Sequence, residues 1–154
     1  LENARIAPLP AKDIEVWIGA TAPAAINRTA RLAEGWLGTP SSTPQQAKEQ
    51  LNQYRQACAE HQRKPSAVAL RRDIFIGASV RQAEEFRSHA VAKGYRGFPE
   101  DALICGDISQ VATQFAELFE AGFTDIIVRN MASDQGQALA TIEALSDVKR
   151  QLHL

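Results

Sequence analysis

The sequence contains little cysteine and no surplus of charge of either sign. Its 154 residues include two cysteines, Cys58 and Cys105, without a CxxC pair and without histidine or aspartate at metal-ligand spacing, so we expect buried reduced thiols and no metal. Lysine and arginine total 17 against 18 acidic residues, and the two signs are interspersed, which argues against a nucleic-acid partner. A small molecule is the expected partner.

Long apolar runs are also absent. No segment approaches the about 18 consecutive apolar residues of a membrane span, and the N-terminus lacks the layout of a signal peptide, so we expect a cytoplasmic protein with no membrane partner. The chain opens with Leu1 rather than methionine, and residues 1–14 are predicted to be a connector that something precedes. Residues 15–154 are predicted to form a single domain or a fragment of one.

Apolar patterning predicts buried strands that alternate with helices. Capping residues and helical spacing predict the helices at residues 22–33, 43–61, 79–93, 107–122 and 134–151, the last burying Ala138, Ile142, Leu145 and Val148. Residues 103–105 are predicted to be at most a short extended segment, which gives four βα units with one extra helix. Such alternation is typical of an α/β fold with parallel strands. The four strands are predicted at Glu15–Ala20, Gly35–Gly38, Ala67–Gly77 and Asp125–Arg129.

The strongest candidate for a ligand-binding site is the turn Gly19-Ala20-Thr21-Ala22. In parallel α/β folds, ligands collect at the carboxyl ends of strands. Gly19 and Ala20 permit close approach of the backbone, the free amides at the start of the helix attract an anion, and Thr21 adds a hydroxyl. A phosphate suits this turn. The alternative is a tight strand-to-helix turn in which Thr21 only caps the helix.

For the other polar and aromatic residues, the sequence predicts a location or a partner but no specific function. Arg71 and Asp73 fall on the same face of the third strand and are expected to pair, in a structural or a catalytic role, and Arg129 ends the last strand where it could reach an anion. Trp17 and Trp36 are expected in the core. The three histidines show no triad or metal spacing and are expected at the surface: His61, His89 and His153.

Two stretches, "VWIGATAPAAINRTARLAEGWLG" and "LICGDISQVATQFAELFEAGFTDIIVR", closely resemble the C-terminal part of the bacterial luciferase-like flavin-dependent oxidoreductases and monooxygenases. The resemblance runs from about Val16 to Leu152. It implies a TIM-type (β/α)8 barrel, of which this chain would be the C-terminal half, with its strands as the fifth to the eighth. The segment "KGYRGFPEDALICGD" falls where that family carries extra segments.

The same resemblance implies that Gly19, Ala20, Thr21 and Ala22 bind the phosphate end of FMN or a deazaflavin, although Ala20 stands where a second glycine is usual. It implies oxygenation by reduced flavin or hydride transfer on a small-molecule substrate, and no catalytic residue is assigned. The rival interpretation is a stand-alone, non-catalytic α/β module for oligomerisation or binding. Half a barrel exposes strand edges and an apolar inner face, so we expect an N-terminal half-barrel or a second copy of the chain as partner.

Overall fold

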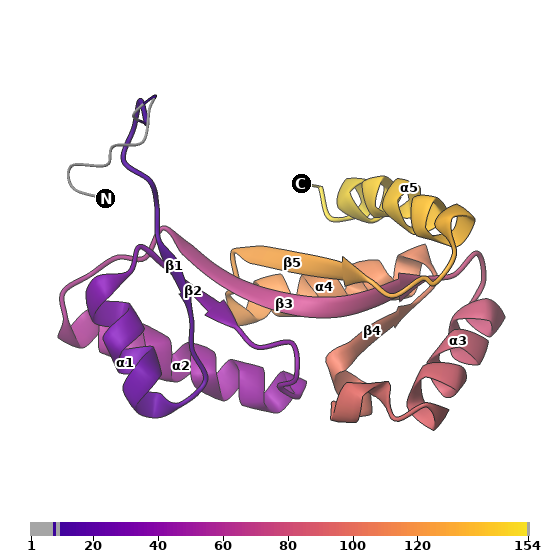
Figure 1. Ribbon diagram of the computed structural model, residues 1–154, viewed down its shortest axis with the longest axis horizontal. Helices are drawn as coiled ribbons and strands as arrows, with labels where there is room; N and C mark the ends of the chain where they lie inside the picture. Colours follow the sequence, from indigo (N-terminus) through magenta and orange to yellow (C-terminus); the bar gives the residue numbers. More distant parts are fainter. Residues whose placement is uncertain (1–7, 9, 154) are drawn as a thin grey trace, which may run out of the picture.

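The computed structural model describes residues 8 and 10–153. Of the expected connector at residues 1–14, residues 1–7 and 9 lie outside the described part, and residues 10–14 form neither helix nor strand (Figure 1). Within the described part, no helix is both long enough and apolar enough to cross a membrane.

Parallel strands and helices alternate along the chain, which confirms the predicted α/β class (Figure 1). The helices are α1 (Pro23–Leu32), α2 (Pro44–Glu60), α3 (Val80–Ala92), α4 (Ile108–Ala121) and α5 (Gln135–Gln151), and two short 3-10 turns, η1 (Tyr95–Gly97) and η2 (Glu100–Ala102), follow α3. The strands are β1 (Trp17–Gly19), β2 (Gly35–Gly38), β3 (Ala67–Ile76), β4 (Leu103–Gly106) and β5 (Asp125–Asn130).

The prediction of four strands was wrong, because the short segment that begins at Leu103 is a fifth strand, β4. Residues 103–106 pair with residues 73–76 of β3, while β2 pairs with residues 67–70 and β5 with residues 69–74. Because β5 overlaps both other pairings, it occupies one edge of β3, and β2 and β4 share the opposite edge end to end. A strand of four residues, LICG, is too short for its period to be read from the sequence.

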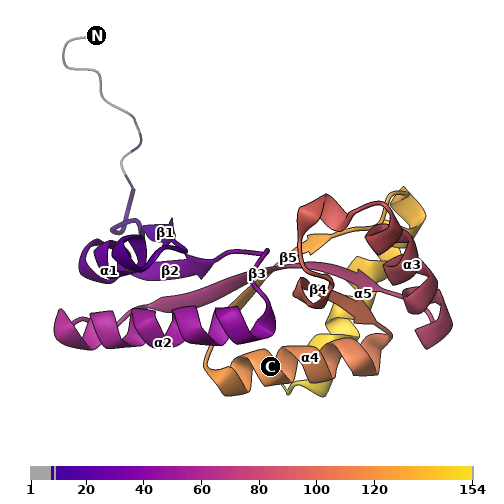
Figure 2. The ribbon, with the colours of Figure 1, turned by 90° about the horizontal axis from the view of Figure 1, so that it is seen from below.

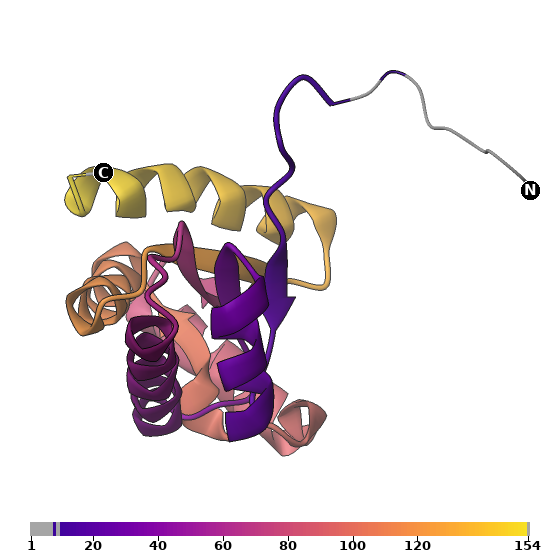
Figure 3. The same ribbon diagram turned by 90° about the vertical axis from the view of Figure 1, so that its left-hand side faces the viewer.

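The sheet has an outer face, covered by α1, α2, α4 and α5, and an inner face. Ile74, Ile76 and Ile104 pack with the outer helices, whereas Phe75, Leu103 and Cys105 pack with α3 on the inner face. The step from β3 back to β4 reverses the direction in which strands are added, so a right-handed crossover places α3 on the other face. Figure 2 shows α3 apart from α1 and α2, and Figure 3 shows α1 and α2 side by side.

The segment that contains α3 and β4 begins and ends at the same place on the sheet. The backbone N–H of Gly77 donates to the carbonyl of Gly106 at 3.0 Å, so the two ends of residues 77–106 are joined at the carboxyl end of the sheet. This segment contains all but the last residue of the stretch that the resemblance marks as an extra segment, and α4 then leads to β5.

The inner face is less apolar than expected. Away from α3 it carries glycine, alanine and the half-buried Leu37 together with Arg71, Asp73 and Arg129, and its exposed large apolar side chains are Trp17 and Ile127. The expected buried stripe of α5 was also partly wrong, since Ile142 is 56% exposed while Thr141 and Val148 are buried. The helix packs against α4, β3 and β5, and its apolar residues Leu139 and Ile142 remain exposed.

Candidate functional site

The turn after β1 is fixed from behind by a buried tryptophan. Gly19 is the register partner of Leu37, and the Ala20 amide donates to the Leu37 carbonyl at 3.4 Å. The indole Nε1 of Trp36, which is fully buried, donates to the Ala20 carbonyl at 2.9 Å. The Ala20 methyl belongs to the outer core, so the residue that replaces the usual glycine does not crowd the open side of the turn.

The open side of the turn presents unpaired donors. Helix α1 has Ala22 as its N-cap with no side-chain hydrogen bond, so the expectation that Thr21 caps this helix was wrong. The extended backbone of Ala22 (φ −73°, ψ 143°) begins the helix one residue later and leaves the Thr21 hydroxyl free. Among the described residues, the amides of Thr21, Ala22 and Ala24 have no hydrogen-bond acceptor. Such amides at a helix N-terminus favour an anion.

Gly19 leaves room that nothing in the described chain fills. A Cβ built on it would meet only the Leu37 carbonyl oxygen, at 3.8 Å, and its backbone does not require glycine. Packing within the protein therefore gives no reason for glycine at this position. Glycine at position 19 is instead explained if a group from outside the chain approaches the backbone closely there.

Thr21 borders a cavity of about 390 Å³ between the first turns of α1 and α2. Hydroxyls from the loop after β2 contribute to it, and the Thr39 and Ser41 oxygens lie 3.0 Å apart. The helix predicted at residues 43–61 begins with a capping box formed by Thr43 and Gln46, which fixes the start of α2 beside the loop. The other lining residues are Pro23, Ser42, Gln46, Glu49, Gln50 and Gln53, so Gly19, Ala20 and Ala22 lie outside the lining.

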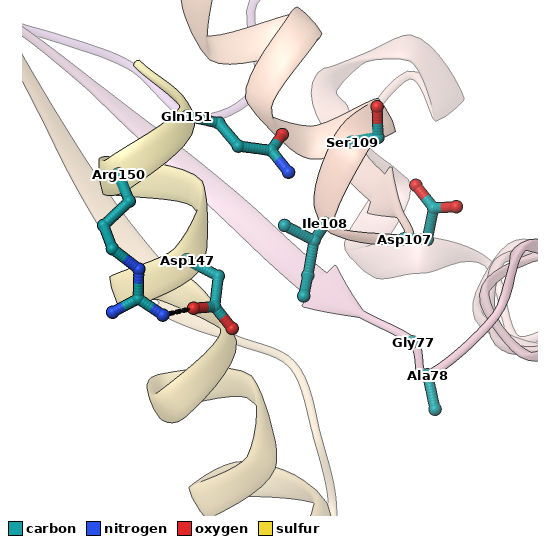
Figure 4. A pocket seen from close by; sticks show the side chains of 8 residues that line it. All are labelled: Gly77, Ala78, Asp107, Ile108, Ser109, Asp147, Arg150 and Gln151. Atoms are coloured by element: carbon teal, nitrogen blue, oxygen red, sulfur yellow. Dashed lines mark ion pairs between the residues drawn. The ribbon is translucent and has the colours of Figure 1, made fainter. Parts of the chain in front are cut away.

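A larger cavity, of about 620 Å³, lies elsewhere, between the start of α4 and the end of α5 (Figure 4). Its one cationic side chain, Arg150, is paired with Asp147, and the carboxylate of Asp107 accepts from the Gln110 amide as the N-cap of α4. The two carboxylates in its lining disfavour an anion. Size alone does not make this open groove the better phosphate site.

The expected pair between Arg71 and Asp73 is confirmed at 3.8 Å, and it forms part of a larger group. Arg129 lies 3.5 Å from Asp73, and Arg96 lies 3.1 Å from it. The sequence did not reveal Arg96, because it stands in the loop "YRGFPED" after α3, where no periodicity relates a residue to the sheet. The two flanking glycines, Gly94 and Gly97, were the only local signal.

The remaining expectations have mixed outcomes. Both cysteines are free and buried, as predicted, and burial raises the pKa of the Cys105 thiol to about 11. Trp36 lies in the core, but Trp17 is 38% exposed on the edge strand and its indole donates to Glu15. Within the described residues, no three histidine, cysteine, aspartate or glutamate side chains gather as metal ligands.

Comparison with solved structures shows the fold. An F420-dependent secondary alcohol dehydrogenase, in complex with an F420-acetone adduct, matches at TM-score 0.72 and 13% identity over 96% of this chain and 52% of that one. Apo-MsnO8 matches at TM-score 0.74 and 17% identity over 96% and 54%. The oxygenating constituent of 3,6-diketocamphane monooxygenase from Pseudomonas putida, in complex with FMN, matches at TM-score 0.64 and 15% identity over 86% and 47%.

The chain thus spans about half the length of the solved structures that it matches. Parallel strands and alternating helices agree with the half of a TIM-type barrel expected from the two sequence stretches. No protein of curated function matches the sequence. The family model described as "Luciferase-like monooxygenase" matches residues 1–104, from the N-terminus to the first residues of β4. The chain therefore belongs to the luciferase-like monooxygenase family.

Proposed function

We propose that this chain is the C-terminal part of a flavin-dependent oxidoreductase and that the turn Gly19–Ala22 holds the phosphate of FMN or a deazaflavin. The observation that carries the proposal is the group of unpaired donors at this turn, the amides of Thr21, Ala22 and Ala24 and the Thr21 hydroxyl. They follow directly on Gly19, where the backbone is open. The similar structures described with F420 or FMN support this class of cofactor.

The residues at the turn fit such a phosphate. Thr21 and the hydroxyls of Thr39 and Ser41 line the cavity beside the turn, and the one carboxylate of this lining, Glu49, accepts a hydrogen bond from Gln45 at 2.7 Å. When bound, a reduced flavin or deazaflavin supplies hydride transfer or, for flavin, oxygenation of a small-molecule substrate. This chain's part is to bind and orient the cofactor through its phosphate, and we assign it no catalytic residue.

Titration of the 154-residue protein with FMN and with riboflavin, followed by flavin fluorescence, tests this role. We expect FMN to bind at least about tenfold more tightly than riboflavin, because only FMN carries the phosphate that these charge-assisted bonds would hold. Coenzyme F420 in place of FMN distinguishes the two cofactor classes. Equal binding of riboflavin and FMN would refute a phosphate site, and no binding of any of the three would favour the stand-alone, non-catalytic module.

We further propose that the open strand edges pair with a complementary half-barrel, either an N-terminal half or a second copy of this chain. Among the described residues β1 pairs only with β2, and β5 only with β3. Val16, Trp17 and Ile127 are exposed close to these edges. Unpaired edges with apolar side chains drive association. Light scattering should give the mass of a dimer, and a monomer over a wide concentration range would exclude the second copy.

A further inference from the structure

A buried carboxylate on the inner face is surrounded by three arginines. Asp73 is fully buried, and its Oδ2 atom lies 3.1 Å from Arg96 Nη1 and 3.5 Å from Arg129 Nη1. Arg71 approaches its Oδ1 atom at 3.8 Å. One carboxylate neutralises one of these three cations, and each arginine keeps 35% or more of its side chain exposed. The group, which we call the arginine cluster, therefore presents excess positive charge to the inner face.

Three separate elements bring the arginine cluster together. Arg71 and Asp73 are two residues apart on β3, and Arg129 is the register partner of Asp73 on β5. Arg96 comes from η1, where Tyr95 and Arg96 have φ of 31° and 57° between Gly94 and Gly97, which also have positive φ. Non-glycine residues rarely adopt this conformation, and strained backbone of this kind gathers at ligand sites.

Arg96 also borders a cavity of about 300 Å³ beside α3. Its other walls combine apolar surface from Phe86, Ala90 and Met131 with the cation of Lys93. The Phe98 ring also holds Arg96 in place, because the guanidinium lies over this ring at 4.6 Å from its centroid. A positive charge at the wall of a partly apolar cavity suits a ligand that has an anionic end and a hydrocarbon body.

Tyr95 supplies an independent sign of a missing partner. It lines the same cavity and is 4% exposed, yet its hydroxyl has no hydrogen-bond partner among the described residues. Burial, and next the charge of Asp73, raise the pKa of this hydroxyl to about 12, so it stays protonated and can donate. A buried hydroxyl without a partner is costly, and an acceptor on a bound ligand would remove that cost.

We propose that the cavity beside α3 binds a small organic carboxylate. Its carboxylate pairs with Arg96 and accepts a hydrogen bond from the Tyr95 hydroxyl, and its hydrocarbon part packs against Phe86 and Met131. Arg96 donates to Asp73 at 3.1 Å, but the three arginines share a single carboxylate, so Arg96 keeps positive charge to offer a ligand. The apolar walls favour an organic acid over inorganic phosphate. The site stands apart from the Gly19–Ala22 turn and does not depend on the flavin.

Calorimetric titration of the flavin-free protein with benzoate, benzamide and inorganic phosphate tests the assignment. We expect benzoate to bind at least about tenfold more tightly than benzamide, which has the same shape without the charge. We also expect benzoate to bind more tightly than phosphate, which lacks the hydrocarbon body. Equal affinities of benzoate and benzamide would overturn the proposal, and so would phosphate binding as tight as that of benzoate.

Amino-acid substitutions test whether benzoate binds in the cavity beside α3. Arg96→Gln and Tyr95→Phe should each weaken benzoate binding, the first by about tenfold or more. Arg81→Gln is the matched control, because Arg81 lies on the exposed side of α3 and, among the described residues, pairs only with Glu85. Arg96→Gln could disturb η1, so Met131→Ala, outside that turn, provides a second test of the same cavity. Unchanged benzoate binding in Arg96→Gln and Met131→Ala, both folded by circular dichroism, would refute the site.

Competition separates this site from the proposed cofactor site. We expect saturating FMN to leave benzoate affinity unchanged, and Thr21→Ala to leave it unchanged as well. Displacement of benzoate by FMN would show that both ligands use one site and would overturn the proposal of a separate carboxylate site. Failure of FMN to bind, with benzoate binding intact, would instead refute the proposed function alone.

Discussion

The indole of Trp36 donates its Nε1 proton to the carbonyl of Ala20 at 2.9 Å, and both groups are buried. The residue that fills the core behind β2 thus also fixes the turn after β1. Trp36 stacks on Tyr54 and on Phe123, with ring centroids at 5.3 and 6.2 Å, so the turn is tied to both α2 and the loop that precedes β5.

Replacing Trp36 should therefore affect stability and the turn together. We expect Trp36→Phe to lower the free energy of unfolding by about 2–4 kcal/mol, because it removes buried volume and leaves the Ala20 carbonyl unpaired. It should also weaken FMN binding. Trp17→Phe is the control, since Trp17 is partly exposed and its indole bonds to the exposed Glu15. Chemical denaturation measures both variants, and equal losses would contradict this account.

Gly19 should matter for binding and not for folding. We expect Gly19→Ala to change the free energy of unfolding by less than about 1 kcal/mol, because its Cβ would meet only the Leu37 carbonyl at 3.8 Å. FMN binding should fall, since the methyl occupies the open side of the turn. In the control Gly35→Ala, the new Cβ would lie 2.7 Å from the Trp17 ring, and stability should fall. A Gly19→Ala variant that binds FMN normally would argue against the proposed contact.

Two threonines at helix starts should behave oppositely. Thr43 caps α2 through a hydrogen bond from the Gln46 amide at 3.1 Å, so Thr43→Ala should cost about 1 kcal/mol of unfolding free energy. Thr21 makes no cap bond to α1, so Thr21→Ala should leave stability unchanged and weaken FMN binding. Thermal denaturation and FMN titration of the two variants check this contrast. Destabilisation by Thr21→Ala would show that the hydroxyl caps the helix after all.

Asp73 should be the most sensitive polar residue of the inner face. We expect Asp73→Asn to lower the free energy of unfolding by about 2–3 kcal/mol, less than for a fully buried ion pair, because the three arginines are partly exposed. Glu85→Gln, which breaks the exposed pair with Arg81, should cost about 0.5 kcal/mol or less. Urea denaturation of the two variants gives the comparison, and similar small losses would show that the cluster adds little to stability.

The thiol of Cys105 should make stability fall at alkaline pH. Its Sγ atom donates to the Ala83 carbonyl at 3.1 Å, and burial raises its pKa from 9.0 to about 11 in the folded protein. The unfolded chain therefore loses this proton first, so the free energy of unfolding should decrease as pH rises from about 9 to 11. Denaturation at several pH values should show a shallower decrease for Cys105→Ala. An identical slope in both proteins would contradict the assignment to Cys105.

Much of the fold could be predicted because it follows from local patterns. Capping residues such as Thr43 and Asp107 gave the starts of α2 and α4, and Gly122, which has φ of 107°, gave the end of α4. The Arg71–Asp73 pair was predictable because a strand places residues i and i+2 on one face.

The features that could not be predicted from the sequence depend on tertiary contacts. β4 is recognised as a strand only through its pairing with the far half of β3. Arg96 reaches Asp73 across 23 residues by way of a turn with positive φ, and no periodicity encodes such an approach. Ile142 repeats with helical spacing, yet its burial depends on a neighbour beyond α4 that the described chain does not provide.

The hydrogen bond between Gly77 and Gly106 joins the two ends of the segment between them. This segment, which we call the cassette, is therefore a unit that can be inserted or removed as a whole. Removing the residues between these two glycines would lead the chain from β3 directly into α4 and leave β1, β2 and the Gly19–Ala22 turn intact in sequence. The cavity beside α3 and Arg96 both lie inside this cassette or on its border. Insertion, deletion or exchange of the cassette would therefore change the lining of the cavity beside α3 without any change to the first turn of α1, so the two proposed ligand sites can evolve separately.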